Sequence, residues 1–350
     1  MKNKRTALLG LGIDSVTEEE AVPRIFHELD IAKTQQTDCR IVVTVNVDFI
    51  VNTLSVFASK AKNPELLRVM QESFFVFADG MPIVLLSKLV GHALKERVAG
   101  SNLFEKMIAQ AAKSGKRVFF LGGNPENTIA TSQILLKKYP DLQIAGMDTS
   151  MIKMDDSQEC LAQHKKICQK IQDDHTDLLL VGLGNPKQEL FAYRNQKALA
   201  GIVSIGIGGT FNFIAGGVKR APRWMQKGCM EWIYRIIQEP RRLIGRYSKG
   251  LVIYSLLSLQ TMLSCLFALL KNSKTKEFSS MPLLKEEASA VSLDLTGIRY
   301  FDNAAKLKWL AIINNAATKQ QKIQLKNCSP FLRMQLKLAR FWADDIKKRI

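Results

Sequence analysis

The sequence predicts an α/β fold, with a Rossmann-like, mostly parallel sheet flanked by helices. Two observations support this prediction. Short apolar segments alternate with stretches of helical periodicity, and most of these segments run into Gly or Asn where they end. Strands that alternate with helices at this spacing form right-handed βαβ crossovers and hence a parallel sheet. Ligands of such sheets bind outside the carboxyl ends of the strands.

The first expected strand is Thr6–Ile13, and Thr17 opens a helix with a capping pattern. A helical pattern covers Phe49–Ala61, and a Pro-Glu pair begins another helix at Pro64. Further strands are expected at these apolar segments: Ile41–Val45, Phe74–Gly80, Arg117–Leu121, Gln143–Ala145, Leu178–Val181 and Ile202–Ile205. The alternation therefore continues over the greater part of the chain.

The chain has 350 residues, enough for two domains, and a formal net charge of +18. The excess of cations indicates that the protein binds nucleic acid, a membrane face or an anionic substrate, and the charge alone does not distinguish among these three partners. The six cysteines are scattered, with neither a paired-Cys motif nor a His at ligand spacing. This pattern disfavours disulfides and a zinc site and fits a reducing cytoplasm. The apolar run near the N-terminus is short and soon meets Asp14, so we expect a strand there rather than a signal peptide.

The candidate catalytic residues are Asp79, Thr44 and Gln188, which lie near expected strand ends, and Arg97, which precedes a helix expected to open at Ser101. A carboxylate that takes the proton of an incoming hydroxyl typically contributes roughly 10²–10⁴-fold to the rate, so Asp79 is the candidate base. The planar fork of Arg97 suits a diphosphate, Thr44 would orient a donor, and Gln188 would hydrogen-bond a sugar or phosphate. Each residue also has a structural alternative. Asp79 could belong to a turn and Arg97 to a surface ion pair. Thr44 could be an ordinary strand residue, and Gln188 a residue at a helix N-terminus.

A candidate substrate-binding set combines glycine, amide and hydroxyl residues near the same strand ends with two arginines of the basic segment that follows: Asn46, Asn124, Asn185, Gly208, Gly209, Thr210, Arg220 and Arg223. A glycine turn after a buried strand exposes backbone N–H groups to an anion. The glycine segments lack the acidic partner of a dinucleotide fingerprint, and there is no P-loop, HExxH or GxSxG motif. Because no DxD motif is present to hold a divalent ion, we expect neither a metal nor another cofactor. The 4 His are isolated and are expected to be structural or solvated.

Seven segments resemble one family, in family order: TVNVDF, FADGMPIV, ERVAGSNL, FFLGGNPEN, LLLVGLGNPKQE, GIGGTFNFIAGGVKRAP and EWIYRIIQEPRRLIGRY. Over roughly residues 5–250 the chain is similar to the WecG/TagA/CpsF glycosyltransferases. The resemblance implies an inverting, metal-independent transfer from a UDP-sugar to a polyprenyl-diphosphate-linked sugar. The transferred sugar would be N-acetylmannosamine or a related hexose or uronic acid. By position, the catalytic aspartate, active-site threonine, arginine and glutamine of the family fall on Asp79, Thr44, Arg97 and Gln188.

In this chemistry Asp79 would deprotonate the acceptor hydroxyl, which attacks the anomeric carbon from the opposite face, so a single displacement inverts the configuration. Arg97 and the N–H groups near Gly208 and Gly209 would neutralise the leaving UDP. The segment between Thr44 and Asp79 is longer than the family pattern and lacks the proline common there. This departure concerns the identity of the donor more than the type of reaction.

The segment from Lys219 to Lys249 carries many Lys and Arg residues with interleaved Trp and Tyr. Near an anionic leaflet each cation contributes up to ~1 kcal/mol. Four of its arginines are therefore expected to contact the membrane or the acceptor diphosphate: Arg235, Arg241, Arg242 and Arg246. A solvated helix face and RNA binding are the alternatives. The uncharged segment Gly250–Leu270 would form a helix about 30 Å long. Its polar residues favour a helix in one leaflet or packed on the catalytic domain, with a spanning helix as the alternative.

The C-terminal part resembles a portion of a STAS domain in the segments LDLTGIRYFDNAAKLKWL and KIQLKNCSP. Strands are expected from Ala290 and over Lys322–Leu325, with helices over 304–317 and 329–341. Where regulated STAS domains carry a phosphorylatable residue, this chain has Asn303 followed by Ala. We therefore expect a module that docks a protein partner or a second copy, rather than a phosphorylation switch.

The chain is thus divided into four predicted parts. Residues 1–215 form the catalytic α/β domain, 216–272 a basic and apolar helical appendage that faces the membrane, 273–287 a linker and 288–350 the STAS-like domain. The predicted role is glycosyl transfer in bacterial surface polysaccharide or teichoic acid-type assembly. The protein would be peripheral or monotopic at the cytoplasmic face of the inner membrane, without a nucleic-acid partner. The alternative is a nucleotide-binding regulatory or RNA-binding protein that uses the basic segment.

Overall fold

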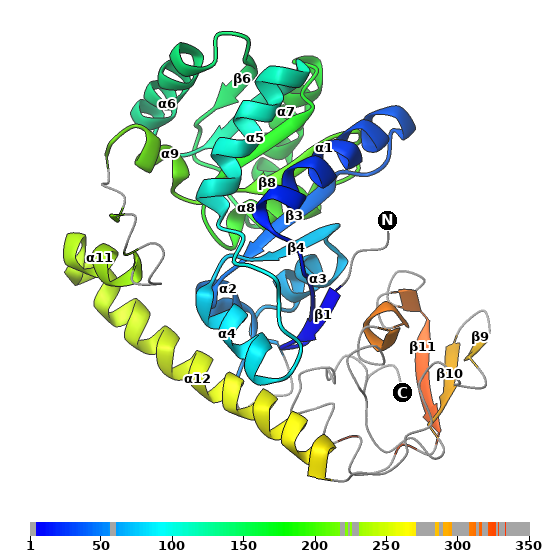
Figure 1. Cartoon of the computed structure of the whole chain (residues 1–350). Helices are drawn as coiled ribbons and strands as arrows, with labels where there is room; N and C mark the ends of the chain where they lie inside the picture. Colours follow the sequence, from blue (N-terminus) through cyan, green and yellow to red (C-terminus); the bar gives the residue numbers. More distant parts are fainter. Residues whose placement is uncertain are drawn as a thin grey trace.

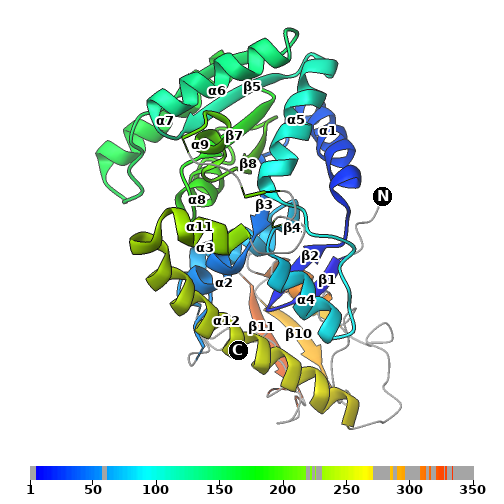
Figure 2. The same cartoon turned by 60° about the vertical axis from the view of Figure 1, so that its left-hand side comes forward.

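Most of the described chain belongs to one α/β unit, and a long helix and a small second sheet follow it (Figure 1). The computed structural model describes residues 5–56, 61–217, 221–222, 225, 231–270, 284–286, 290–295, 308–312, 315–316, 321–326, 328 and 333. Figure 2, turned from the first view, shows the helix α12 running past α2 at one side of this unit.

The central sheet has six strands in the order β4-β3-β8-β7-β5-β6. The strands are β3 Arg40–Val45, β4 Phe75–Ala78, β5 Arg117–Gly122, β6 Gln143–Asp148, β7 Leu178–Gly182 and β8 Val203–Gly206. Each neighbouring pair is parallel. The α/β class and the parallel sheet predicted from the sequence are therefore confirmed, and all the carboxyl ends of the strands meet at one edge.

Helices cover both faces of this sheet (Figures 1 and 2). One face packs against α1 Glu18–Gln35, α5 Gly100–Ser114, α6 Pro125–Lys138 and α9 Thr210–Ile214. The other packs against α2 Val47–Thr53, α3 Pro64–Glu72, α4 Met81–Leu89, α7 Gln158–Asp173 and α8 Lys187–Arg194. Successive residues of β3 alternate between them, so that Val42 joins the first core and Val43 the second. Because both faces are buried, the strands are apolar along almost their whole length.

The N-terminal prediction of one strand over Thr6–Ile13 is wrong. The chain forms a hairpin of β1 Arg5–Leu8 and β2 Leu11–Asp14, which pair antiparallel. Between them Leu9 and Gly10 have φ angles of 52° and 78°. Two successive residues with positive φ match the twist of a tight hairpin, so the chain reverses within what reads as one apolar run. The Asp14 carboxylate accepts the Val76 N–H at 2.8 Å, which places the hairpin beside β4.

Several helix predictions are confirmed at their first residues. Thr17 caps α1, and the reciprocal hydrogen bonds between Thr17 and Glu20 complete a capping box. The helix α3 begins at Pro64 as expected. The helical pattern over Phe49–Ala61 is too long, because α2 ends at Thr53, and residues 57–60 lie outside the described part.

Two helices occupy the region predicted as the appendage, α11 Glu231–Gln238 and α12 Pro240–Leu270. One side of α12 packs onto α2, with Tyr254 and Leu257 buried in the core of the α/β unit. Gln260 Nε2 also donates to Val56 O at 3.1 Å. Among the helices that the structure describes, none combines the length and the apolar character needed to cross a membrane. The predicted packing of this helix on the catalytic domain is therefore observed.

The second sheet is formed by β9 Leu284–Glu286, β10 Ala290–Asp294 and β11 Lys322–Lys326, in the order β11-β10-β9. The pairing of β10 with β11 is parallel, and that of β10 with β9 is antiparallel. Both predicted strands are confirmed, and β9 lies within the stretch predicted as a linker. The helix predicted over 329–341 lies almost wholly outside the described residues, so the STAS resemblance stays a prediction.

Candidate functional site

The ends of β3 and β4 bring Thr44 and Asp79 to the same corner of the sheet. Val45 and Ala78 are paired in register, and the Asp79 N–H donates to Val45 O at 2.8 Å. The first residue of α5, Gly100, lies against both side chains. A Cβ added there would meet Thr44 Oγ1 at 3.2 Å and Asp79 Oδ2 at 3.8 Å. The two residues predicted to be catalytic therefore flank one point, the start of a helix.

The charge state of Asp79 is set by opposing influences. Burial raises its pKa to about 6, and the cations Arg97 and Arg235 counteract that rise. The carboxylate of Glu231 raises the pKa further, and the Gly100 N–H, which donates to Asp79, lowers it. A half-buried carboxylate with such a pKa binds a proton more readily than an ordinary aspartate and is still ionised above neutral pH. These are the properties of a general base.

Two arginines share one carboxylate beside Asp79. Arg97 Nη2 lies 3.4 Å from Glu231 Oε2, and Arg235 Nη2 lies 3.3 Å from Glu231 Oε1. The Arg235 guanidinium is also 5.0 Å from the centre of the Phe213 ring. The Arg97 side chain is only 18% exposed, so its ion pair is largely shielded rather than on the open surface. The pairing brings α11 to the corner of the sheet and leaves one net positive charge next to Asp79.

Gln188 lies further along the same edge and connects two loops. Its side chain is buried, and Oε1 accepts the N–H groups of Gly184 and Gly208, each at 3.1 Å. These glycines belong to the loops that follow β7 and β8. A Cβ at Gly206 would clash with the Gln188 amide, so the backbone and the side chain are closely packed there. Gln188 therefore holds the glycine loops in place, and its contact with substrate stays a prediction.

Glu189, next to Gln188, was given no role in the sequence analysis. Its Oε2 accepts the Asn185 Nδ2–H at 3.2 Å, and Asn185 Oδ1 accepts the Asn52 Nδ2–H at 2.8 Å. Its Oε1 is buried without a hydrogen-bond partner. Burial raises the pKa of Glu189 to about 8. The only sequence signal was its position among polar residues at a strand end, and pattern alone does not reveal how deeply it is buried.

Two asparagines of the predicted binding set cap helices at this edge. Asn46 caps α2, where its side-chain oxygen accepts the Phe49 N–H at 3.2 Å. Asn124 caps α6 in the same way, with the Asn127 N–H at 3.3 Å. Both side chains thus have structural hydrogen bonds at the carboxyl ends of their strands, and the direction of each helix start is fixed.

The glycine turn after β8 also lies at this edge. Gly208 has a φ of 55°, a conformation that glycine adopts readily, and Gly209 precedes α9. Thr210 is buried and donates its hydroxyl to Ile207 O at 2.6 Å. Arg220 and Arg223 lie outside the described residues, so their predicted part in binding has no structural counterpart here.

The four arginines assigned to the membrane or to the acceptor diphosphate have different surroundings. Arg235 belongs to the corner that holds Asp79, as described above. Arg246 makes two hydrogen bonds with Asp48 of α2, at 3.0 and 2.8 Å. Arg241 is exposed, and the side chain of Arg242 lies outside the described part. Of the three arginines whose side chains the structure describes, Arg235 is therefore the one that lies in the candidate site.

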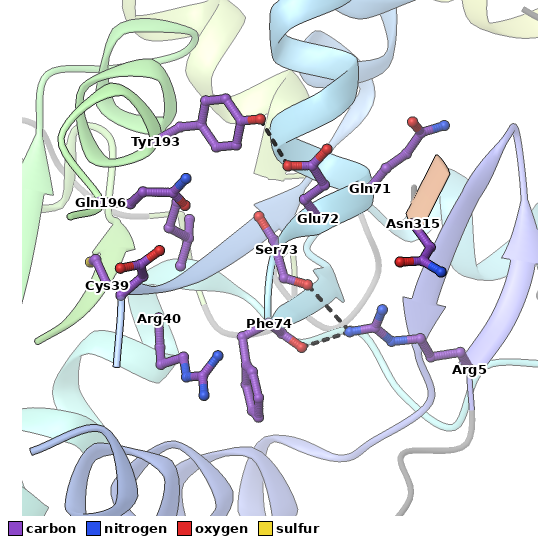
Figure 3. Close-up of a pocket in the computed structure, with 12 residues that line it drawn as sticks. Arg5, Cys39, Arg40, Gln71, Glu72, Ser73, Phe74, Tyr193, Gln196 and Asn315 are labelled. Atoms are coloured by element: carbon purple, nitrogen blue, oxygen red, sulfur yellow. Dashed lines mark hydrogen bonds between the residues drawn. The ribbon is translucent and has the colours of Figure 1, made fainter. Parts of the chain in front are cut away.

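A cavity of about 420 Å³ lies at the opposite ends of β3 and β4 from Asp79 (Figure 3). Arg5, Arg40, Phe74 and Tyr193 are among its lining residues. Arg5 Nη2 donates to Phe74 O at 2.6 Å, and the Tyr193 hydroxyl donates to Glu72. Its polar groups thus serve the packing of the hairpin and of α8, and the cavity does not include any predicted site residue.

A second cavity is lined by Cys160, His164 and Asn195, among others, and Cys160 Sγ lies 3.6 Å from His164 Nε2. Asn195 Nδ2 donates to His164 Nδ1, so the ring proton is on Nε2, which donates to Lys153 O at 2.9 Å. With its proton on Nε2, the nitrogen that faces Cys160, the imidazole has no lone pair there to accept the Cys160 proton, and burial raises the pKa of that thiol. Among the described residues, no three or more His, Cys, Asp or Glu side chains are arranged to hold a metal.

The fold and the site define a doubly wound α/β protein with a carboxylate between arginines at the carboxyl ends of its strands. The chain belongs to the WecG/TagA/CpsF glycosyl transferase family, which it matches over residues 6–265. It is 32% identical over 181 residues to the N-acetylglucosaminyldiphosphoundecaprenol N-acetyl-beta-D-mannosaminyltransferase of Bacillus spizizenii. The Bacillus subtilis protein of the same description is 31% identical over 181 residues.

Each of these alignments covers 52% of this chain and 67% of the relative. The family predicted from the seven motifs is confirmed, and the protein is a glycosyltransferase. The regulatory or RNA-binding alternative is not favoured.

Proposed function

We propose that the protein transfers N-acetylmannosamine, or a related hexose or uronic acid, from a UDP-sugar to a polyprenyl-diphosphate-linked sugar. The two Bacillus relatives support the acceptor, because their names specify N-acetylglucosaminyldiphosphoundecaprenol. The observation that carries the proposal is the corner at β4, where Asp79 has a pKa of about 6 and lies among Arg97, Arg235 and Glu231. The geometry supplies a base for a hydroxyl and cations for a diphosphate.

In the proposed step the acceptor hydroxyl gives its proton to Asp79. The oxygen lone pair forms the new bond to the anomeric carbon, and the bond from that carbon to the UDP oxygen breaks. The electron pair leaves with the diphosphate, and Arg97 and Arg235 stabilise its charge. Thr44 orients the donor beside Asp79. Attack and departure occur on opposite faces of the sugar, so the configuration is inverted without a metal ion.

The remaining predicted residues complete the proposed donor site. Backbone N–H groups at the glycine turn after β8 would face the nucleotide, with Gln188 holding that turn against the loop after β7. The side chains of Asn46, Asn124 and Asn185 lie at the same edge, as does Thr210. Arg220 and Arg223 are proposed to contact the diphosphate.

The outward side of α12 supports a peripheral membrane location. Its inner side packs on α2, whereas Leu251 is 63% exposed, Leu259 is 52% exposed and Leu266 is also exposed. Exposed cations of the same helix include Arg241 and Lys249. An apolar stripe with cations beside it suits the interface of an anionic leaflet. We propose that this side of α12 lies in the cytoplasmic leaflet of the inner membrane, next to the lipid-linked acceptor.

The test of the reaction measures UDP release by the full chain from UDP-N-acetylmannosamine and a polyprenyl-diphosphate N-acetylglucosamine, with and without EDTA. We expect turnover in both conditions, and turnover lowered by at least about 10²-fold with Asp79→Asn. Turnover that disappears on chelation would show that a metal is required. Binding of RNA without any transfer of sugar would favour the regulatory alternative.

The membrane location has a separate test. Leu251→Gln combined with Leu259→Gln should reduce sedimentation with anionic vesicles, since both side chains face outward and neither forms the core. Ile129→Gln on α6, which is also exposed, is the matched control and should sediment like the unmodified protein. Equal sedimentation of all three proteins would rule out this side of α12 as the contact.

A further inference from the structure

The helix α5 starts at the candidate site without a cap of its own. Its N-cap residue is Ala99, whose side chain cannot accept a hydrogen bond. The first N–H groups of a helix nevertheless need acceptors. Two carboxylates on other elements supply them. Asp79 accepts the Gly100 N–H from the side of the site, and Glu18 Oε1 accepts the Ala99 N–H at 3.2 Å.

Glu18 is the first residue of α1, and its carboxylate reaches across to α5. It is only 8% exposed. Besides the Ala99 N–H, Oε1 accepts the Asn102 Nδ2–H at 2.9 Å, and Oε2 lies 3.4 Å from Lys106 Nζ. The Glu18 carboxylate thus contacts the N-cap residue of α5 and one residue in each of its first two turns. We name these contacts of Glu18 with Ala99, Asn102 and Lys106 the Glu18 clamp.

The stretch before α5 is tied to the same part of α1. The Lys95 N–H donates to Ser15 Oγ at 3.2 Å, and Lys95 Nζ donates to Glu20 at 2.6 and 2.8 Å. The Glu18 N–H donates to Glu96 Oε2 at 3.2 Å. Arg97 lies within this stretch. The start of α1 therefore holds both the arginine of the candidate site and the amide that donates to Asp79.

We propose that Glu18 is a positioning residue for glycosyl transfer, because its clamp fixes the start of α5 and thereby the places of Arg97 and the Gly100 N–H around Asp79. The inference rests on the role of Asp79 proposed above. Glu18 itself does not reach the site, since its contacts are with the opposite side of the first turns of α5. The room for movement is small, because Gly100 already lies close to Thr44 Oγ1.

In the part of the chain that the structure describes, the charged and donating groups that face Asp79 are Arg97, the Gly100 N–H, Arg235 and Glu231. The first two belong to the clamped segment, and the other two to α11. Both clamped groups favour the ionised carboxylate. If the clamp is lost and they move away, the pKa of Asp79 rises, and the acidic limb of the pH–rate profile moves to higher pH. A misplaced base and cation also lower kcat, by roughly 10- to 100-fold for a displacement of about 1 Å.

The experiment compares Glu18→Ala, Glu18→Gln and Glu19→Ala in the full chain. Glu19→Ala is the matched control, because Glu19 is exposed and its substitution removes the same charge from the same turn of α1. UDP release is followed between about pH 5 and about pH 9, with kcat and KM separated. Thermal unfolding shows which variants fold.

We expect Glu18→Ala to lower kcat by roughly 10-fold or more, with little change in donor KM, and to move the acidic limb upward. Glu18→Gln keeps an oxygen for the Ala99 and Asn102 donors and should restore most of kcat and the position of the limb. Glu19→Ala should match the unmodified protein. A Glu18→Ala protein with the kcat and the pH profile of Glu19→Ala would overturn the inference.

Asp79→Asn separates this inference from the proposed function. If that variant keeps its activity and its acidic limb, the assignment of the base fails, and the role of Glu18 fails with it. If it is inactive while Glu18→Ala behaves like the control, only the Glu18 inference fails. Should Glu18→Ala not fold, Asn102→Ala removes one bond of the clamp from the α5 side. It should move the limb in the same direction, and an unmoved limb would contradict the inference.

Discussion

Two carboxyl groups at the same edge of the sheet have contrasting surroundings. Asp79, after β4, is flanked by Arg97 and Arg235 and accepts a backbone N–H from Gly100. Glu189, beyond β7, has the amides of Asn185 and Gln188 as its hydrogen-bonding side-chain neighbours among the described residues, where one of its oxygens has no partner. Burial raises both pKa values, to about 6 for Asp79 and to about 8 for Glu189.

The difference shows how position among charges decides what a buried carboxyl group can do. With two cations nearby, Asp79 is ionised above neutral pH and can take a proton from an acceptor. With no cation shifting its pKa among the described residues, Glu189 keeps its proton at neutral pH and acts as a neutral hydrogen-bonding group between the loops. The site therefore holds one carboxylate suited to chemistry and one suited to structure.

The largest expected effect tests this contrast directly. Asp79→Asn should lower kcat by at least about 10²-fold, because the amide cannot accept the proton. Glu189→Gln replaces a protonated carboxyl group by an amide of the same shape and should leave kcat little changed. UDP release under saturating substrates measures both. Equal losses in the two variants would show that Glu189 takes part in the reaction, and circular dichroism shows whether either variant has misfolded.

The pH dependence of the reaction is the next test. The base is active when deprotonated, so activity should rise with pH through about 6, the pKa of Asp79. Glu231 raises that pKa and also pairs with both arginines. Glu231→Gln should therefore lower the pKa and move the acidic limb to lower pH. Glu239→Gln, the next acidic residue along this part of the chain, is the control, and a limb that stays in place in Glu231→Gln would contradict the electrostatic account.

Much of this corner could be predicted from the sequence, because it depends on local order. The apolar strands, the polar residues at their ends and the parallel topology place Thr44 and Asp79 at one edge. The capping box at Thr17 and the Pro64 start are likewise local signals, and they are confirmed. The hairpin at Leu9 was missed because Leu-Gly is not a strong turn signal.

The remaining features depend on contacts between distant parts of the chain. Glu231 lies 134 residues from Arg97 in the sequence, yet the two form an ion pair. Glu18 likewise lies 84 residues from Asn102. The burial of Glu189 follows from the close packing of Gly206 against its carboxyl group. No spacing within one segment encodes such contacts, so the clamp and the shared carboxylate could be found only in the folded chain.

A smaller effect concerns the stability of the fold. The folded-state pKa of Glu189, about 8, exceeds its usual value of 4.5. The folded protein therefore binds the Glu189 proton more tightly than the unfolded chain does. The contribution of this proton to the free energy of unfolding is complete below pH 4.5 and is lost as pH rises towards 8. Chemical denaturation measures the free energy of unfolding of the unmodified protein and of Glu189→Gln. The unmodified protein should lose stability relative to the variant over that interval, by at most about 1.4 kcal/mol per pH unit. If this difference in free energy does not change with pH, Glu189 is ionised in the folded protein.

The smallest expected effect comes from a third carboxylate at this edge, Asp48, which pairs with Arg246 near the start of α2. The Arg246 side chain is 49% exposed, so solvent screens the pair, and its contribution to stability is about 0–1 kcal/mol. Asp48→Asn should therefore reduce the free energy of unfolding only slightly, and less still in high salt, as chemical denaturation at two salt concentrations can measure. Because Asp48 is not among the main groups that shift the pKa of Asp79, the acidic limb should not move measurably. A limb that moves with Asp48→Asn would mean that the charges around Asp79 are coupled through α2 as well as through α5 and α11.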